Sequence, residues 1–395
     1  MRHVIETERV DLFDVNIVIT MRVLLDREIE FDRLKEAFDK ACSVHEVLGS
    51  KVVLDASGAA YYEKADGQNN SFTKTDSDLL TIIKENQKKR FKIENGEFMR
   101  GFLSPDGLVF MMHHLGGDGK SLLYFIETFM NCLEGKECEF VPFKNLTLEN
   151  LPAQSEVPFF YKWLVKRWNK SWEKEKKIFD FSDMDREYES FWKSHETKIE
   201  IRRYEKEELT ALLRKSKEAG VSLTAYVIAD MIKDSDKAND IGLAVDGRTD
   251  NNRSMGNQAT GISVKYKYDP GKTVEENAKA VSRLMQKKLS DDRYRFFVLK
   301  FMGLIDPTLK DSLNLEHAGC FSGKTSSKVA EILGYGKKVR DISITNLTRV
   351  DIPLEYGDVK IEEIAFIPPI VSYAKNVYGM VTANDVMIVS RHIYE

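Results

Sequence analysis

The stretch MMHHLGGDG, residues 111–119, is the part of the sequence around which the rest of the chain can be read. An apolar run, residues 108–112, leads into it, and an amphipathic run, residues 121–133, follows it. This order predicts a strand that ends in two histidines, then a glycine-rich turn, then a helix. A histidine held at the end of a strand by a tight loop suits general acid–base chemistry.

The two histidines allow a purely structural interpretation and a functional one. A single histidine on an apolar strand is usually a hydrogen-bonded core residue, whereas two adjacent histidines before a glycine turn and Asp118 are a rarer pattern. Successive strand residues point to opposite faces, so His113 and His114 are not expected to bind one metal ion. One histidine is expected to face the core and the other a cleft, and no metal site is predicted.

The composition indicates a soluble globular protein without a nucleic-acid partner. The chain has 395 residues, enough for two domains of ordinary size, with 42% apolar and 31% charged residues. Its net charge of −4 provides no overall basic field for nucleic acid. No apolar run approaches the roughly 20 residues of a transmembrane helix, and the first residues lack the apolar core of a signal peptide. The sequence has four cysteines, Cys42, Cys132, Cys138 and Cys320. Their spacing is not that of a metal site or a redox motif, which favours a reduced cytoplasmic protein.

The two halves of the chain share a coarse order of strand, helix, hairpins and helix, without a clear sequence repeat. Turn residues predict hairpins around residues 55–58 and 105–107. The mostly polar residues 64–78 are expected to form a loop, and residues 151–158 break regularity as a linker would. Strands are expected at residues 15–24, 198–204, 241–245, 261–268, 341–346, 361–367, 377–381 and 386–390, and helices at residues 31–44, 79–88, 207–219, 225–233, 274–289 and 294–305.

One basic and aromatic segment has two interpretations. Residues 159–181 mix Trp163, Trp168 and Trp172 with seven lysines and arginines. An interfacial membrane helix has this composition. A helix that bridges two domains and turns a basic face to water has it too. The second interpretation is favoured, because runs of charge usually lie on solvated faces.

Sequence motifs for nucleotide binding, for a serine nucleophile and for a zinc site are not present with the required spacing. A nucleotide-binding phosphate loop needs a glycine five positions before its last glycine, but His114 precedes Gly119 there and Ala318 precedes Gly323. The chain also lacks a Gly-x-Ser-x-Gly nucleophile turn and a His-Glu-x-x-His zinc helix.

The pattern HHxxxDG at residues 113–119 resembles the active-site signature of the chloramphenicol acetyltransferase-like superfamily. This group includes nonribosomal peptide condensation domains, alcohol acetyltransferases and the plant-type HxxxD acyltransferases. The match is complete at His113, His114, Asp118 and Gly119. The resemblance implies an acyltransferase that moves an acyl group from a thioester to a hydroxyl or amine, with His114 as general base. The thioester, acyl-coenzyme A or a phosphopantetheinyl group on a carrier protein, is then a cosubstrate, and no bound cofactor is implied.

Looser similarity extends over most of the chain. Residues 24–48 resemble the opening strand and helix of the superfamily, and residues 207–229 resemble its helix pair at the start of the second half. Residues 342–348 resemble the short strand that lines the opposite wall of the active-site channel. The Asp-Phe-Gly-Trp-Gly motif of the plant-type branch is missing, and residues 355–358 read EYGD where it would occur. The chain is therefore expected to lie outside that branch.

The resemblance also implies roles for single residues. Asp118 is expected to pair with Arg248 and to hold the shape of the loop rather than to relay a proton. The tetrahedral oxyanion needs donors, and Thr345, Asn346 or backbone N–H groups of residues 116–119 are candidates. The remaining positions of the motif are structural: His113, Gly116, Gly117 and Gly119.

The implied architecture is α+β, with two chloramphenicol acetyltransferase-like subdomains arranged as a V-shaped pseudo-dimer around a central channel. The N-terminal subdomain, residues 1–180, carries the motif, and residues 181–395 form the opposite channel wall. One chain supplies both walls, so a monomer should suffice. The expected partners are a small-molecule acyl acceptor and an acyl or peptidyl carrier protein. Two alternatives stay open: a carrier-protein-dependent condensation catalyst, and a non-catalytic binding relative, against which the intact His114, Asp118 and Gly119 argue.

Overall fold

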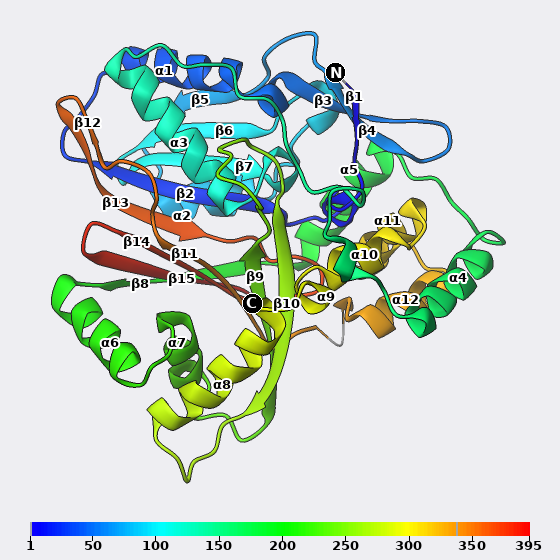
Figure 1. Cartoon of the computed structure of the whole chain (residues 1–395). Helices are drawn as coiled ribbons and strands as arrows, with labels where there is room; N and C mark the ends of the chain where they lie inside the picture. The colour runs from blue at the N-terminus through cyan, green and yellow to red at the C-terminus, as the bar shows by residue number, and fades with distance from the viewer. Residues whose placement is uncertain (1, 337–338) are drawn as a thin grey trace.

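The structure is a computed structural model that describes residues 2–336 and 339–395, and it is built around two six-stranded sheets (Figure 1). The first sheet has the strand order β12-β13-β2-β7-β6-β5, and the second has the order β10-β9-β11-β14-β15-β8. The strands of the first sheet are β2 (Val18–Leu25), β5 (Ser71–Lys74), β6 (Met99–Ser104), β7 (Gly107–His113), β12 (Glu355–Tyr356) and β13 (Val359–Ile367). A small third sheet contains β1 (Arg2–Val4), β4 (Ala60–Lys64) and β3 (Ser50–Leu54). The fold class is α+β, as predicted.

Two helices cover one face of the first sheet: α1 (Phe31–Val44) and α3 (Gly119–Glu134) (Figure 1). The Phe38 ring of α1 lies 6.4 Å from the Phe110 ring of β7 and 5.7 Å from the Phe125 ring of α3. All three rings are fully buried. Burial of large apolar rings is the main stabilising term for such a layer. It fixes the position of β7, and therefore of the histidines at its end.

The second sheet is built from the other half of the chain. Its strands are β8 (Thr197–Tyr204), β9 (Ala238–Asp246), β10 (Ala259–Lys267), β11 (Ile342–Arg349), β14 (Asn376–Ala383) and β15 (Val386–Tyr394). Strand β11 runs parallel to both β9 and β14, and the other pairs are antiparallel. Three helices lie against this sheet in Figure 1: α6 (Lys206–Glu218), α7 (Leu223–Met231) and α8 (Val274–Leu289).

The second half of the chain also completes the first sheet. Strand β13 pairs antiparallel with β2, with Phe366 opposite Met21, and it contacts β14 and β15 of the second sheet. The Ser390 hydroxyl of β15 donates to the Phe366 carbonyl oxygen at 2.6 Å. The two sheets are therefore joined through β13. The boundary expected between residues 180 and 181 falls at Asp180, the N-cap of α5 (Phe181–Ser194).

Several expected elements differ from the structure. The loop expected at residues 64–78 is wrong in part, because Ser71–Lys74 form β5, parallel to β6. Phe72 is the one buried residue of β5. A single apolar side chain does not produce the alternation of apolar and polar residues from which a strand is predicted. The helix expected at residues 294–305 is broken into α9 (Asp292–Arg295) and α10 (Phe297–Gly303). Four further helices are α2 (Leu79–Asn86), α4 (Phe159–Trp172), α11 (Pro307–His317) and α12 (Lys324–Leu333), of which the last two were not expected.

No helix within residues 2–336 and 339–395 combines the length and the apolar character that crossing a bilayer requires.

Candidate active site

Strand β7 ends at His113, whose ring is part of the core. The ring is 2% exposed, lies 6.1 Å from the Phe91 ring, and its Nδ1 atom accepts a hydrogen bond from the Leu115 N–H at 3.2 Å. Burial lowers the pKa of His113 to about 3. His113 is therefore neutral at physiological pH, and it stabilises the turn that follows.

His114 begins a single 3-10 turn, His114–Gly116, and its ring lies beside Asp11. Its Nδ1 atom is 3.7 Å from Oδ2 of Asp11, is buried, and has no hydrogen-bond partner among the described residues. The side chain as a whole is 18% exposed. Burial lowers the pKa of His114 below its usual value, and the charge of Asp118 opposes this shift only in part. The imidazole is thus neutral at neutral pH, the state that a general base needs.

Asp11 belongs to a buried acidic segment that the sequence pattern did not predict as part of the site. Burial raises the pKa of Glu8, Asp11 and Asp14 to about 7 each. The Asn257 amide donates to Oδ2 of Asp11 at 3.0 Å. The carboxyl group that faces His114 is therefore anchored by a residue just before β10. The charges of Asp118 and Asp14 oppose the lowering of the His114 pKa by burial. These acids recur at every third residue, which can be seen in the sequence. Their position in the sequence, far from His114, gives no indication that the two meet in the fold.

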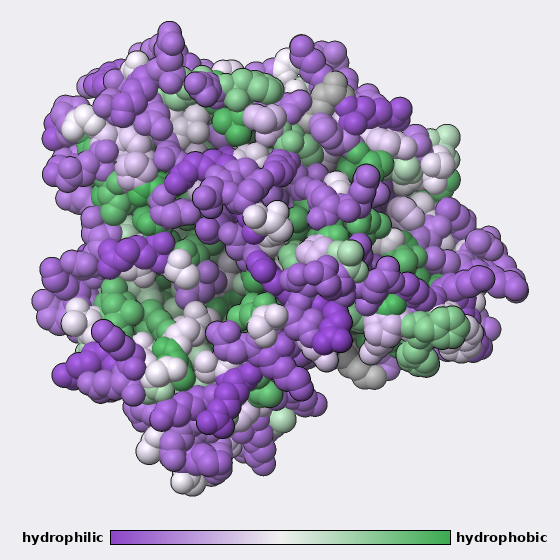
Figure 2. Space-filling view, in the orientation of Figure 1, coloured by the Kyte–Doolittle hydropathy of each residue, from purple (hydrophilic) through white to green (hydrophobic). Residues whose placement is uncertain are grey.

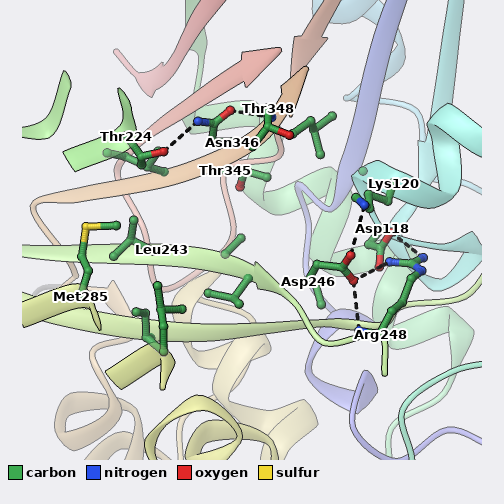
Figure 3. Close-up of a pocket in the computed structure, with 18 residues that line it drawn as sticks. Asp118, Lys120, Thr224, Leu243, Asp246, Arg248, Met285, Thr345, Asn346 and Thr348 are labelled. Carbon is green, nitrogen blue, oxygen red and sulfur yellow. Dashed lines mark hydrogen bonds and ion pairs between the residues drawn. The ribbon is translucent and has the colours of Figure 1, made fainter. Parts of the chain in front are cut away.

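Asp118 and Arg248 form a buried two-point ion pair (Figure 3). The Arg248 Nη1 atom lies 2.9 Å from Oδ2 of Asp118, and Nη2 lies 3.1 Å from Oδ1. Burial alone would raise the pKa of Asp118, but the charge of Arg248 and hydrogen bonds from Arg248, Ser121 and Gln258 hold it below the usual value. The structure thus brings Arg248 to the motif, as the resemblance implies.

Asp118 is also the N-cap of α3, and its loop needs glycine on both sides. Its Oδ1 atom accepts from the Ser121 N–H at 2.9 Å, and Oδ2 accepts from the Gln258 N–H at 2.9 Å. Gly117 has φ +148°, and a Cβ atom there would lie 2.4 Å from Cβ of Ser121. A Cβ atom at Gly119 would approach the Leu347 side chain to 3.0 Å. The loop is therefore fixed closely against both halves of the chain.

A cavity of about 390 Å³ begins where the motif enters α3 (Figure 3). Its floor is apolar and comes from the second sheet and α8. Its polar groups come from the motif and the start of α3, from α7 and β11, and from Asp246 and Arg248 at the end of β9. The lining includes Asp118, Gly119, Lys120, Thr224, Leu243, Val245, Asp246, Ile262, Met285, Leu289, Ile344, Thr345, Asn346, Leu347 and Thr348. His114 is not among the lining residues, so the cavity adjoins the loop that carries the base rather than the imidazole itself.

The two side chains expected to stabilise the oxyanion both line this cavity from β11. The Asn346 amide donates to the Thr224 hydroxyl at 2.9 Å and accepts from the Thr348 N–H at 2.7 Å, so its orientation is fixed. No hydrogen bond of the described residues joins Thr345 or Asn346 to His114. Gly119 and Lys120 also line the cavity, and because they are the first residues of α3 their N–H groups have no acceptor inside the helix.

Comparison with known proteins identifies the fold. No protein-family model matches the chain, and no curated protein matches it. Among solved structures, it resembles the first condensation domain of the calcium-dependent antibiotic synthetase, with a TM-score of 0.64 and 13% identity, over 100% of this chain and 91% of that one. It resembles polyketide synthase associated protein 5 from Mycobacterium tuberculosis, with a TM-score of 0.64 and 15% identity, over 99% and 94%. It also resembles the TRI3 trichothecene 15-O-acetyltransferase from Fusarium sporotrichioides, with a TM-score of 0.63 and 12% identity, over 99% and 90%.

These likenesses extend over nearly the whole chain. The protein therefore has the chloramphenicol acetyltransferase-like fold, with its two halves in one polypeptide, as the motif predicted.

Proposed function

We propose that the protein is an acyltransferase that uses His114 as general base and a thioester as acyl donor. The observation that carries this proposal is the state of His114, a neutral imidazole whose buried Nδ1 atom faces Asp11 at 3.7 Å. It stands at the end of an apolar strand, in a loop that the Asp118–Arg248 pair fixes. A neutral, largely buried imidazole in a fixed loop is suited to act as general base in acyl transfer to a weak nucleophile.

The reaction would proceed by addition and elimination. The acceptor oxygen or nitrogen forms a bond to the thioester carbonyl carbon while Nε2 of His114 takes its proton. The C–S bond of the tetrahedral intermediate then breaks, and the leaving thiolate takes the proton back from Nε2. The oxyanion needs donors during this step, and the N–H groups of Gly119 and Lys120 at the start of α3 are suited to it, because they have no acceptor within the helix.

Asp11 acts in this proposal as a positioning residue. When ionised, it attracts the Nδ1–H group of His114 and leaves the lone pair of Nε2 free to accept a proton. When protonated, it would donate to Nδ1 and leave the proton on Nε2, which is the wrong tautomer for a base. The separation of 3.7 Å is longer than a hydrogen bond, and such contacts often shorten only when the substrate is bound.

The cavity beside the motif is proposed to hold the apolar part of a substrate. Its floor is formed by aliphatic and methionine side chains, whereas its polar and charged groups come from the motif, α7, the end of β9 and β11. This division is typical of small-molecule sites, in which the apolar surface binds and a few polar groups orient.

The experiment that tests the function is free-thiol release from acyl-coenzyme A in the presence of a panel of small alcohols and amines. Turnover supports a stand-alone acyltransferase. A second candidate, a condensation catalyst that depends on a carrier protein, is favoured by the likeness to a condensation domain over 91% of that domain. Turnover with an acylated carrier protein but not with acyl-coenzyme A would support that candidate. No thiol release with either donor would support a non-catalytic relative of the same fold.

A further inference from the structure

Helix α4 (Phe159–Trp172) has a buried face that fixes its position. The Trp172 indole donates to the Thr308 hydroxyl at 2.8 Å, and the Trp168 ring lies 6.2 Å from the Phe301 ring of α10. Val165 on the same face is 1% exposed. These contacts hold the helix against α10 and α11, so the orientation of its other face is fixed as well.

The outer face of α4 exposes aromatic rings that this packing does not need. Phe159 is 82% exposed, Phe160 is 62% exposed and Trp163 is 49% exposed. The rings of Phe160 and Trp163 lie 6.3 Å apart, so they form one patch. Figure 2 shows light green side chains among hydrophilic ones at the lower right, at the end of α4 in Figure 1. Contiguous exposed apolar groups of this kind usually mark an interaction surface.

The same face carries positive charge without compensation inside the helix. Residues 159–172 contain four cations, Lys162, Lys166, Arg167 and Lys170, and no acidic residue. Lys162 pairs with Glu156 at 2.5 Å. Lys166, Arg167 and Lys170 are exposed and take part in no ion pair among the residues that the structure describes. A bridging helix with a solvated basic face explains these cations, but it does not explain the exposed rings beside them.

We propose that this outer face, the α4 patch (Phe159, Phe160, Trp163, Lys166, Arg167 and Lys170), docks on the surface of an anionic phospholipid membrane. Aromatic rings insert at the level of the lipid headgroups, and the cations beside them meet the negative charge of the lipid. A helix of 14 residues is about 21 Å long and would lie along the surface. The absence of any acidic residue in the helix favours an extended anionic surface as the occupant. This inference does not rest on the proposed acyl transfer.

The test is sedimentation of the full chain with sucrose-loaded vesicles of phosphatidylcholine alone or of an equimolar mixture with phosphatidylserine. One variant removes the rings (Phe159→Ser, Phe160→Ser, Trp163→Ser), and another removes the charges (Lys166→Gln, Arg167→Gln, Lys170→Gln). A matched control removes the same charge from an exposed face of α8 (Lys279→Gln, Arg283→Gln, Lys287→Gln). Thermal unfolding reports whether each variant is folded, which is expected because the changed side chains are exposed.

Wild-type protein is expected to sediment with the mixed vesicles and far less with phosphatidylcholine alone. Each Lys or Arg near an anionic surface contributes about fivefold, so the charge variant should bind about a hundredfold more weakly. The ring variant should bind about tenfold more weakly or worse, and raised salt should weaken binding of the wild type. Wild-type protein that stays in solution with both vesicle types overturns the proposal, as does equal loss in the charge variant and the α8 control. Binding of an acidic carrier protein that only the α4 variants weaken, without vesicle binding, would assign the patch to a protein partner instead.

Discussion

The Nδ1 atom of His114 and the Oδ2 atom of Asp11 face each other at 3.7 Å, although the two residues belong to segments far apart in the sequence. Both groups are buried, and burial shifts their pKa values toward each other: that of His114 down and that of Asp11 up, to about 7. His114 is therefore neutral at neutral pH, while Asp11 changes its charge near pH 7. The charge of Asp11 decides which nitrogen of the imidazole carries the proton, and so whether Nε2 of His114 can act as a base.

The first prediction concerns the pH dependence of kcat/KM for acyl transfer. Asp11 is protonated below its pKa of about 7, so activity of the wild type should fall as the pH drops through about 7. In Asp11→Asn this ionisation is lost, and the uncharged amide no longer selects the Nδ1–H tautomer. We expect kcat/KM at pH 8 to fall by about tenfold to a thousandfold, with no inflection near pH 7.

The control for that experiment is Asp14→Asn, a buried acid on the same segment that accepts from the Ser372 N–H at 2.8 Å. Its charge acts on the pKa of His114, but no hydrogen bond or ion pair of the described residues joins it to the imidazole, so it cannot select the tautomer. This variant should keep the inflection near pH 7. An inflection that survives in Asp11→Asn would show that Asp11 does not set the state of the base.

The second prediction uses the same Asp14 variant to measure stability against pH. The pKa of Asp14 is raised from about 3.8 in the unfolded chain to about 7 in the folded protein. Between these values the folded state binds more protons, so the contribution of Asp14 to stability is lost as the pH rises from about 4 to about 7. Asp14→Asn should therefore have a higher Tm relative to wild type at pH 8 than at pH 5. An exposed acid, Asp66, has a lowered pKa because it pairs with Lys51, and Asp66→Asn should not show this gain at pH 8. A Tm difference for Asp14→Asn that does not change with pH would contradict its buried, uncharged state at low pH.

The third prediction is that Asp118 and Arg248 are energetically coupled. Removal of one partner of a buried pair costs roughly 3–5 kcal/mol, because the other charge remains buried alone. A double-mutant cycle with Asp118→Asn and Arg248→Gln should give an interaction energy of about 0.5–3 kcal/mol in thermal or denaturant unfolding. The double variant should lose little more activity than the worse single one, since each change displaces the loop of His114.

The reference for this cycle is an exposed pair, Glu189 and Lys193 of α5, at 2.7 Å. Their cycle should give no more than about 0.5 kcal/mol. Simple additivity at Asp118 and Arg248 would mean that their contact does not hold the loop.

The fourth prediction tests the cavity. Met285→Trp places a larger side chain into the cavity from α8. It should lower kcat/KM for donors or acceptors with a bulky apolar part more than for the smallest ones, because only the former need that volume. The neighbouring Leu284 is 37% exposed and does not line the cavity, so Leu284→Trp is the matched control. Equal losses for small and bulky substrates in Met285→Trp would show that substrates do not enter there.

Sequence patterns predicted the parts of the fold whose apolar residues recur with a regular period. The helix expected at residues 31–44 has those bounds as α1, because Leu34, Phe38 and Ala41 share its buried face. The turn after β7 was predicted because glycine and Asp118 are typical of a capped helix start. The likeness of solved structures to the whole chain confirms the fold inferred from the motif.

Segments that bury polar side chains were not predicted. Helix α11 was missed because residues 308–315 are all buried, polar ones among them, so that no amphipathic pattern remains. Its Asp311 pairs with Arg9, whose Nε donates to Oδ1 at 2.8 Å, and both side chains are 1% exposed. Such pairs exist only in the folded chain. The same holds for Asp11, whose place beside His114 depends on the meeting of two distant segments.

A variant of His113 distinguishes a loss of stability from a loss of the chemical step. Its buried ring should make His113→Ala less stable, as a Tm decrease, because the change leaves a cavity beside Phe91. The chemical step should suffer less than in His114→Ala.

The most direct test of His114 as general base is the rate of free-thiol release from an acyl thioester by wild type and by His114→Ala, with the acceptor panel present and with Tm measured in parallel. If His114 is the general base, His114→Ala keeps the fold and loses about 10²- to 10⁴-fold in rate, the usual contribution of a general base. A folded His114→Ala variant that releases thiol at close to the wild-type rate would contradict that role.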